Sequence, residues 1–237
     1  MVVWLFAGGG EAEARGLIPF LEKHFVLCTF QRKTPIRRKP GPKPNKIEAG
    51  HGYGRTGRSL AHELQRQLKA ALVRQESCDL ILVIDDLDCH DAQHQEQRFL
   101  QAINSILSIT NIERCIGFAA PELEAWLVAD WNNTIARDVD FRSNHEAMRW
   151  WLSQEKRVPF DAPETFSVYD QSKDSCQEKL SNEIINAAMQ QGRNYSKAIH
   201  TPRLLEKIDP QIVQAKCPLF QRWYTCLSNF CNQEVTR

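Results

Sequence analysis

The sequence lacks the features that mark membrane and secreted proteins. Among its 237 residues, no apolar run approaches the roughly 20 residues that span a bilayer. The opening residues, 1–6, carry no basic stretch and run directly into three glycines, which does not fit a secretory signal. We therefore expect a cytoplasmic protein that has no membrane partner.

Several catalytic and metal-binding signatures are also missing. The sequence has no GxxxxGK[ST] motif and no GxSxG motif, so we expect neither ATP hydrolysis by the chain itself nor a serine nucleophile. His90 and His94 have no HExxH context, so we interpret them as surface residues. No CxxC pair occurs, and we expect reduced, mostly buried thiols with neither a disulfide framework nor a zinc site. The eight cysteines are Cys28, Cys78, Cys89, Cys115, Cys176, Cys217, Cys226 and Cys231.

Charge is balanced overall but unevenly distributed. The 30 Lys and Arg residues nearly match the 29 Asp and Glu residues, which argues against an indiscriminate polyanion binder. Residues 32–46 nevertheless hold seven bases and no acid, interleaved with prolines, and predict an exposed, extended basic loop within 32–58. A solvated surface loop is the simpler interpretation, but the composition favours contact with nucleic-acid phosphates. The expected contacts are Arg37, Arg38, Lys39, Lys43, Lys46, Arg55 and Arg58.

Short apolar runs alternate with amphipathic stretches over residues 1–130. This alternation predicts an α/β domain with a parallel sheet flanked by helices. The expected strands are 2–7, 25–30, 79–84 and 112–120, and the expected helices are 11–23, 59–74, 92–107 and one that starts at Pro121. Residues 131–237 predict a mainly helical C-terminal appendage packed on the sheet, with helices at 144–154, 176–191, 202–208 and 218–230.

Acidic residues follow the first, third and fourth of the expected strands, and those after the fourth are Glu122 and Glu124. Glu11 follows the first, and Asp86 and Asp88 close the third. Ligands bind at the carboxyl ends of parallel strands, so these acids converge if the first and third strands are neighbours. Their carboxylate oxygens suit Mg²⁺ or Mn²⁺. On an extended strand end, Asp86 and Asp88 point to the same side and Asp85 to the other.

Three further acids have two interpretations each. Asp91 is either the N-cap of the next helix or an outer metal ligand. Glu122 and Glu124 either add metal ligands or are charged residues in the first turn of a helix, and for Glu124 the second role is favoured.

Three motifs together resemble the TOPRIM-related families. They are Gly8-Gly9-Gly10-Glu11 after the first strand, Asp86-Leu87-Asp88 at the end of the third, and the ten residues Pro121 to Asp130, PELEAWLVAD. The last is similar to a PExExWLLAD signature of bacterial proteins, and Tyr195-Ser196-Lys197 and Cys217-Pro218-Leu219-Phe220 also resemble that family. The resemblance implies a TOPRIM-like fold akin to the nucleases of the overcoming-lysogenization-defect class.

The resemblance also implies a function. It suggests a Mg²⁺-dependent nuclease acting on DNA or RNA, plausible as a bacterial defence effector, with Glu11, Asp86 and Asp88 catalytic and Asp91 and Glu122 as further metal ligands. Such nucleases commonly carry an acid where this chain has Ala7, so Glu11 either takes over that task or is itself the expected acid. The alternative is a catalytically weak nucleic-acid-binding subunit of an ABC-type ATPase complex. A homodimer is also compatible with the sequence.

Overall fold

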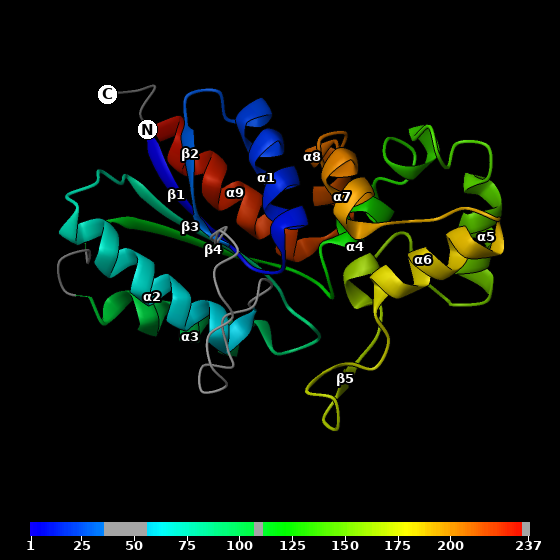
Figure 1. Ribbon diagram of the computed structural model, residues 1–237, viewed down its shortest axis with the longest axis horizontal. Coiled ribbons are helices and arrows are strands. Elements are labelled where there is room, and N and C mark those ends of the chain that lie inside the picture. The colour runs from blue at the N-terminus through cyan, green and yellow to red at the C-terminus, as the bar shows by residue number, and fades with distance from the viewer. Residues whose placement is uncertain (36–55, 107–110, 234–237) are drawn as a thin grey trace, which may run out of the picture.

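Four parallel strands form the central sheet of the computed structural model, which describes residues 1–35, 56–106 and 111–233. Their order is β2-β1-β3-β4. The strands are β1 (Val2–Ala7), β2 (Thr29–Thr34), β3 (Leu80–Asp86) and β4 (Glu113–Ala119). Helices flank this sheet, and the C-terminal part is mainly helical (Figure 1), which confirms the predicted α/β fold class.

Two pairs of helices cover the two faces of the sheet. Helices α1 (Glu11–His24) and α9 (Pro218–Gln233) lie on one face, and α2 (Gly57–Val73) and α3 (Ala92–Asn104) lie on the other (Figure 1). Side chains of β3 alternate between two hydrophobic cores. Leu82 and Ile84 pack on the α1 side, whereas Ile81 and Val83 pack on the α2 side. The apolar sequence of β3 therefore reflects burial on both faces, as predicted for a central parallel strand.

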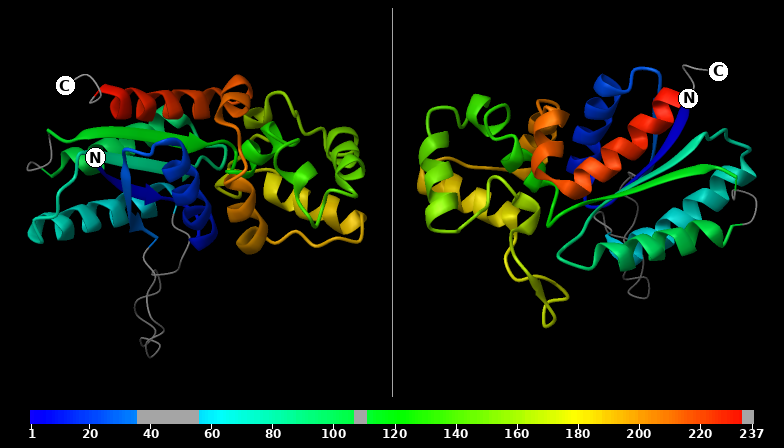
Figure 2. Two further views of the ribbon diagram at one scale, coloured as in Figure 1. Left: turned by 90° about the horizontal axis from the view of Figure 1, so that it is seen from above. Right: turned by 180° about the vertical axis from the view of Figure 1, so that it is seen from behind.

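The C-terminal part begins beyond the end of the sheet and then returns to it. It contains α4 (Glu124–Ala129), α5 (His145–Gln154), α6 (Leu180–Gln190), α7 (Lys197–Leu205) and α8 (Pro210–Lys216), and a small hairpin of β5 (Tyr169–Asp170) and β6 (Ser175–Cys176). Helix α9 then runs along the sheet (Figure 2), where Trp223 stacks on Trp126 of α4 with ring centroids 5.5 Å apart. No helix within the described ranges is long and apolar enough to cross a membrane.

Several element boundaries differ from the predictions. The helix predicted at 176–191 begins only at Leu180, after strand β6, and the one predicted at 202–208 spans Lys197–Leu205. Strand β2 begins at Thr29, not at Phe25, and it contains Arg32 and Lys33, the first two bases of the predicted loop. Lys33 is ion-paired with Glu76 and lies over the ring of Trp4. Residues 36–55 of that loop lie outside the described residues, and its predicted end is wrong because Gly57 and Arg58 already belong to α2.

The helix after β4 begins at Glu124, three residues later than predicted. The intervening backbone pairs with the end of β3. The amide of Asp88 donates to the carbonyl of Pro121 at 2.9 Å, and the amide of Leu123 donates to Asp86 Oδ1 at 2.9 Å. Pro121 is thus part of a bend between β4 and α4 and not the first helical residue.

The prediction that all cysteines are reduced is wrong for one pair. Cys89 and Cys176 form a disulfide, 87 residues apart in sequence. Of the free cysteines, Cys28, Cys115, Cys217 and Cys231 are buried, as predicted. The disulfide links the segment after β3 to the β5–β6 hairpin, two segments that only the tertiary fold brings together.

Candidate functional site

The carboxyl ends of β1, β3 and β4 lie side by side at one edge of the sheet. Strand β1 pairs with β3 from Val3 opposite Leu80 to Ala7 opposite Ile84, so the condition for the convergence of their acids, that the first and third strands are neighbours, is met. Glu11 is the first residue of α1 and follows β1 after the glycine turn. The side chains of residues 11–13 lie outside the described part, so Glu11 is placed by its backbone alone.

Asp86 and Asp88 lie at this edge but not on one extended strand. Strand β3 ends at Asp86, and Asp88 has a φ of 48°, in the left-handed region. The predicted extended alternation of the two carboxylates is therefore wrong. The chain turns here because the amides of Leu87 and Asp88 hydrogen-bond to the carbonyls of Ala119 and Pro121, 2.8 and 2.9 Å away, and so follow the end of β4.

Lys179, just before α6, lies among these carboxylates. Its Nζ is 2.8 Å from Asp88 Oδ1, and the two side chains are 38% and 18% exposed. Burial lowers the pKa of Lys179, but the hydrogen bond and charge of Asp88, with the charges of Glu122 and Asp86, outweigh it and raise the pKa. An ammonium group therefore supplies positive charge at the place where the sequence predicts a metal ion.

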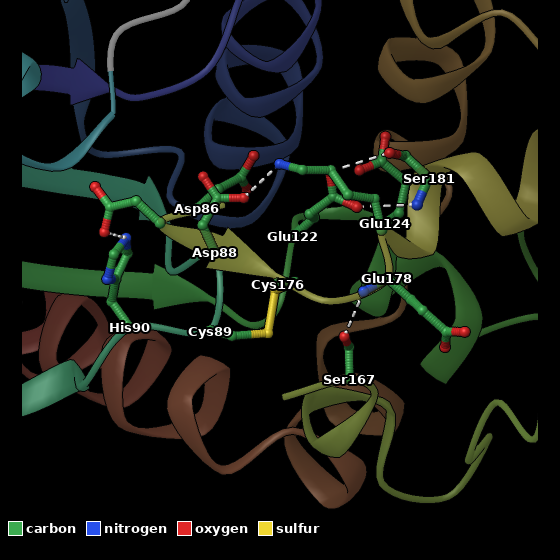
Figure 3. A network of polar contacts seen from close by, with 12 residues as sticks. Asp86, Asp88, Cys89, His90, Glu122, Glu124, Ser167, Cys176, Glu178 and Ser181 are labelled. Carbon is green, nitrogen blue, oxygen red and sulfur yellow. Dashed lines mark hydrogen bonds and ion pairs between the residues drawn. A yellow bond between two sulfur atoms is a disulfide. The ribbon is translucent and has the colours of Figure 1, made fainter. Parts of the chain in front are cut away.

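Glu122 and Glu124 are buried side chains with polar partners from the C-terminal helices. Glu122 accepts hydrogen bonds from the amide and hydroxyl of Ser181 at 2.9 and 3.0 Å (Figure 3). Glu124 accepts one from the hydroxyl of Thr201 at 3.1 Å. Lys197 Nζ lies 3.7 Å from Glu122 and 3.2 Å from Glu124. Glu124 does lie in the first turn of α4, as predicted, but fully buried, and Glu122 precedes that helix.

Asp85 faces the α2 side of the sheet, opposite to Asp86, as predicted. It is 3% exposed, and its Oδ2 accepts a hydrogen bond from the amide of Gly57 at 2.6 Å, at the start of α2. Burial raises the pKa of Asp85 to about 8. A Cβ at Gly8 would lie 1.9 Å from Asp85 Oδ1, so the turn after β1 requires glycine at this position.

The remaining predicted residues divide into three groups. Asp91 is the N-cap of α3, where it accepts a hydrogen bond from the amide of His94 at 2.7 Å; an outer role at a metal stays a prediction. Arg58 is exposed in the first turn of α2. The other predicted nucleic-acid contacts, Arg37, Arg38, Lys39, Lys43, Lys46 and Arg55, lie outside the described residues.

The donor types at this edge fit a hard divalent cation. Asp86, Asp88 and Glu122 offer carboxylate oxygens, the ligands that Mg²⁺ prefers, and the Lys179 ammonium already occupies a cation position on Asp88. Within the part of the chain that the structure describes, no three Asp, Glu, His or Cys side chains are gathered closely enough to hold a metal. In this conformation the ammonium group of Lys179 pairs with Asp88, and that of Lys197 pairs with both Glu122 and Glu124.

The sequence prediction missed Lys179, Ser181 and the Cys89–Cys176 disulfide. Lys179, Ser181 and Cys176 lie within residues 176–181, about 90 positions after the DxD and Cys89, and no spacing within the sequence connects the two segments. Lys197 had one signal, since it belongs to the Tyr195-Ser196-Lys197 triplet of the resemblance.

Comparisons with known proteins give one match. A family model described as a domain of unknown function, DUF4276, matches residues 8–228, nearly the whole chain. No curated protein and no solved structure matches the chain.

Proposed function

The chain belongs to the DUF4276 family, and we propose that it is a cytoplasmic Mg²⁺-dependent nuclease that hydrolyses phosphodiester bonds of DNA or RNA. The observation that carries this proposal is the convergence of acidic positions at one sheet edge. Asp86 and Asp88 at the end of β3 lie beside Glu122 after β4, and α1 begins at Glu11 beside them. This is the edge where open parallel sheets bind ligands.

Each side chain has a definite role in this proposal. Asp86 and Asp88 would hold the ion, with Glu122 as a further oxygen donor. When bound, Mg²⁺ would polarise the scissile phosphate and lower the pKa of the attacking water. Glu11 is either a ligand or the group that accepts the proton of that water. Lys179 and Lys197 would place positive charge next to a bound phosphate, and the basic residues of 37–58 would contact the nucleic-acid backbone.

One observation favours a second candidate. Three of the acids are already paired with lysines, Asp88 with Lys179 and both Glu122 and Glu124 with Lys197. A domain in this state would bind nucleic acid without cutting it, as a subunit of an ABC-type ATPase complex. The two candidates differ in whether a divalent cation replaces Lys179 on Asp88.

A cleavage panel separates the candidates. Supercoiled plasmid, linear duplex, single-stranded DNA and structured RNA are each incubated with the chain in Mg²⁺, Mn²⁺ or EDTA. The nuclease predicts cutting in metal and none in EDTA, and the substrate that is cut identifies the substrate class. No cutting of any substrate, with salt-sensitive binding retained, favours the ATPase-associated subunit.

A further inference from the structure

The disulfide lies directly beside the candidate site. Cys89 follows Asp88 in the chain, and Cys176 precedes Lys179 by three residues. The covalent bond therefore joins the segment that carries one carboxylate of the site to the segment that carries its ammonium partner. Figure 3 shows the disulfide directly beside Asp88.

Residues 167–179, here called the hairpin arm, have few other attachments to the sheet. Cys176 is the only buried residue of the arm, and residues 171–174 are exposed. The flanking residues Phe166 and Leu180 are buried and fix its two ends. The carbonyl of Lys179 also accepts the amides of Asn182 and Glu183 at 3.0 and 3.2 Å, so its backbone stays on α6 and only its side chain can leave Asp88. The two strands of the arm are only two residues each, and a lone two-stranded hairpin is marginally stable.

Most polar bonds of the arm hold it to itself. Tyr169 donates to Asp174 at 2.7 Å, and the amide of Gln177 donates to the carbonyl of Val168 at 2.8 Å. Toward the segment after β3, the described contacts besides the disulfide are weak. His90 lies 4.0 Å from the exposed Asp174 and 5.0 Å from the ring of Tyr169, and Lys179 forms its partly exposed ion pair with Asp88.

We propose that the Cys89–Cys176 disulfide is a redox-sensitive clamp that holds the Lys179 ammonium on Asp88. In the disulfide form the arm is tethered and Lys179 keeps the carboxylate neutralised. In the dithiol form the arm separates from the segment after β3, the side chain of Lys179 leaves Asp88, and Asp88 becomes available to a divalent cation. The clamp itself stands on the geometry, and only its consequence for cation binding rests on the proposed function.

The chemistry requires a dithiol reductant. Cys176 is buried and Cys89 is partly exposed, so a reductant thiolate attacks the sulfur of Cys89 and Cys176 leaves as a thiolate, which takes up a proton. The second thiolate of the reductant then attacks the mixed disulfide and releases Cys89, which is protonated in turn. The reductant has supplied two electrons and two protons and becomes a cyclic disulfide. Disulfides in reducing compartments are usually transient or redox-sensing.

The test compares the oxidised full chain with the same chain treated with dithiothreitol. Mass spectrometry of alkylated peptides verifies the state of Cys89 and Cys176. Two readouts do not depend on metal or activity: hydrogen exchange of the arm, and the acetylation rate of Lys179. After reduction we expect faster exchange of the amide hydrogens in the arm. We also expect acetylation of Lys179 to become about fivefold faster. Lys173, which pairs with Asp170 within the arm, is the matched control and should change less.

A variant replacing both cysteines, Cys89→Ser with Cys176→Ser, should behave as the reduced chain whether or not the dithiol is present. If that variant fails to fold, chemical reduction of the wild type remains the test. The clamp is overturned if the disulfide is absent from oxidised chain, or if arm exchange and Lys179 acetylation stay unchanged after verified reduction.

Titration with Mn²⁺ separates the clamp from the proposed function. Tighter Mn²⁺ binding by the reduced chain supports both. An arm that opens on reduction without Mn²⁺ binding in either form supports the clamp and contradicts the metal-dependent nuclease.

Discussion

Replacing Lys179 with methionine should tighten the binding of divalent cations at the sheet edge. Lys179 Nζ lies 2.8 Å from Asp88 Oδ1, and its charge also acts on Glu122 and Asp86. A divalent cation that binds these carboxylates must either displace the Lys179 ammonium group or bind against its electrostatic repulsion. Methionine keeps most of the aliphatic stem and removes the charge.

The size of the effect follows from the exposure of the pair. Fully exposed ion pairs contribute about 0.2–1 kcal/mol, and burial strengthens the interaction. With side chains 38% and 18% exposed, Lys179 and Asp88 form a partly exposed pair, for which we take the upper part of that range, about 0.5–1 kcal/mol. That corresponds to roughly a 2- to 5-fold lower dissociation constant for Mn²⁺.

Isothermal titration of the oxidised chain with Mn²⁺ measures this constant. Lys173→Met is the matched control, because Lys173 lies in the same arm and pairs with Asp170 at 3.5 Å, away from the carboxylates of the site. The dissociation constant of Lys173→Met for Mn²⁺ should equal that of the wild type. An unchanged or weaker affinity for Lys179→Met would refute the argument that Lys179 and a divalent cation compete for Asp88.

Three further predictions concern the stability of the fold. Gly117→Ala should lower the free energy of unfolding by about 2–4 kcal/mol in urea, since its Cβ would lie 2.2 Å from the buried ring of Trp223; an unchanged midpoint would contradict this packing. Glu164→Ala should cost about 1–2 kcal/mol in the same assay, because Glu164 accepts hydrogen bonds from the first amides of α9 at 2.9 and 3.1 Å, and a loss under about 0.5 kcal/mol would exclude this capping role. Burial raises the pKa of Asp130 above its ordinary 3.8, so the folded chain retains a proton that the unfolded chain loses, and the free energy of unfolding should fall as the pH rises from about 4 through that raised pKa. Urea unfolding at about pH 4 and about pH 7 measures this change in the free energy of unfolding, and the change should be smaller for Asp130→Asn than for the wild type. An equal change in the variant would show that other groups cause the pH dependence.

The sequence predicted the order of the N-terminal elements because their signals are local. The apolar run of β3 and the amphipathic pattern of α3 each lie within one element, and both appear in the structure at nearly the expected bounds. Strand β2 was placed too early, because the apolar residues 25–30 lie in a turn as well as in the strand, and β2 as an edge strand carries polar side chains. Hydrophobicity alone could not locate its end.

The sequence predicted the candidate-site residues that follow the strands and missed those that the C-terminal segments contribute. Asp86 and Glu122 could be placed together from strand topology alone. Lys179 and Cys176 could not, because their positions depend on how the hairpin arm folds back over the sheet edge. The buried state of Glu124 was also missed, since acids in a first helical turn are usually exposed and only the partners Thr201 and Lys197 reveal its burial.

Metal-dependent cleavage by two matched variants tests the central claim most directly. Asp86→Asn and Asp79→Asn make the same change at opposite ends of the β3 region, and Asp79 accepts a hydrogen bond from the amide of Val2 far from the candidate site. Each is compared with the wild type on the substrate panel in Mg²⁺ and in EDTA. The account predicts metal-dependent cleavage by the wild type and Asp79→Asn, and a loss of at least about 100-fold for Asp86→Asn. Full metal-dependent cleavage by Asp86→Asn would contradict it.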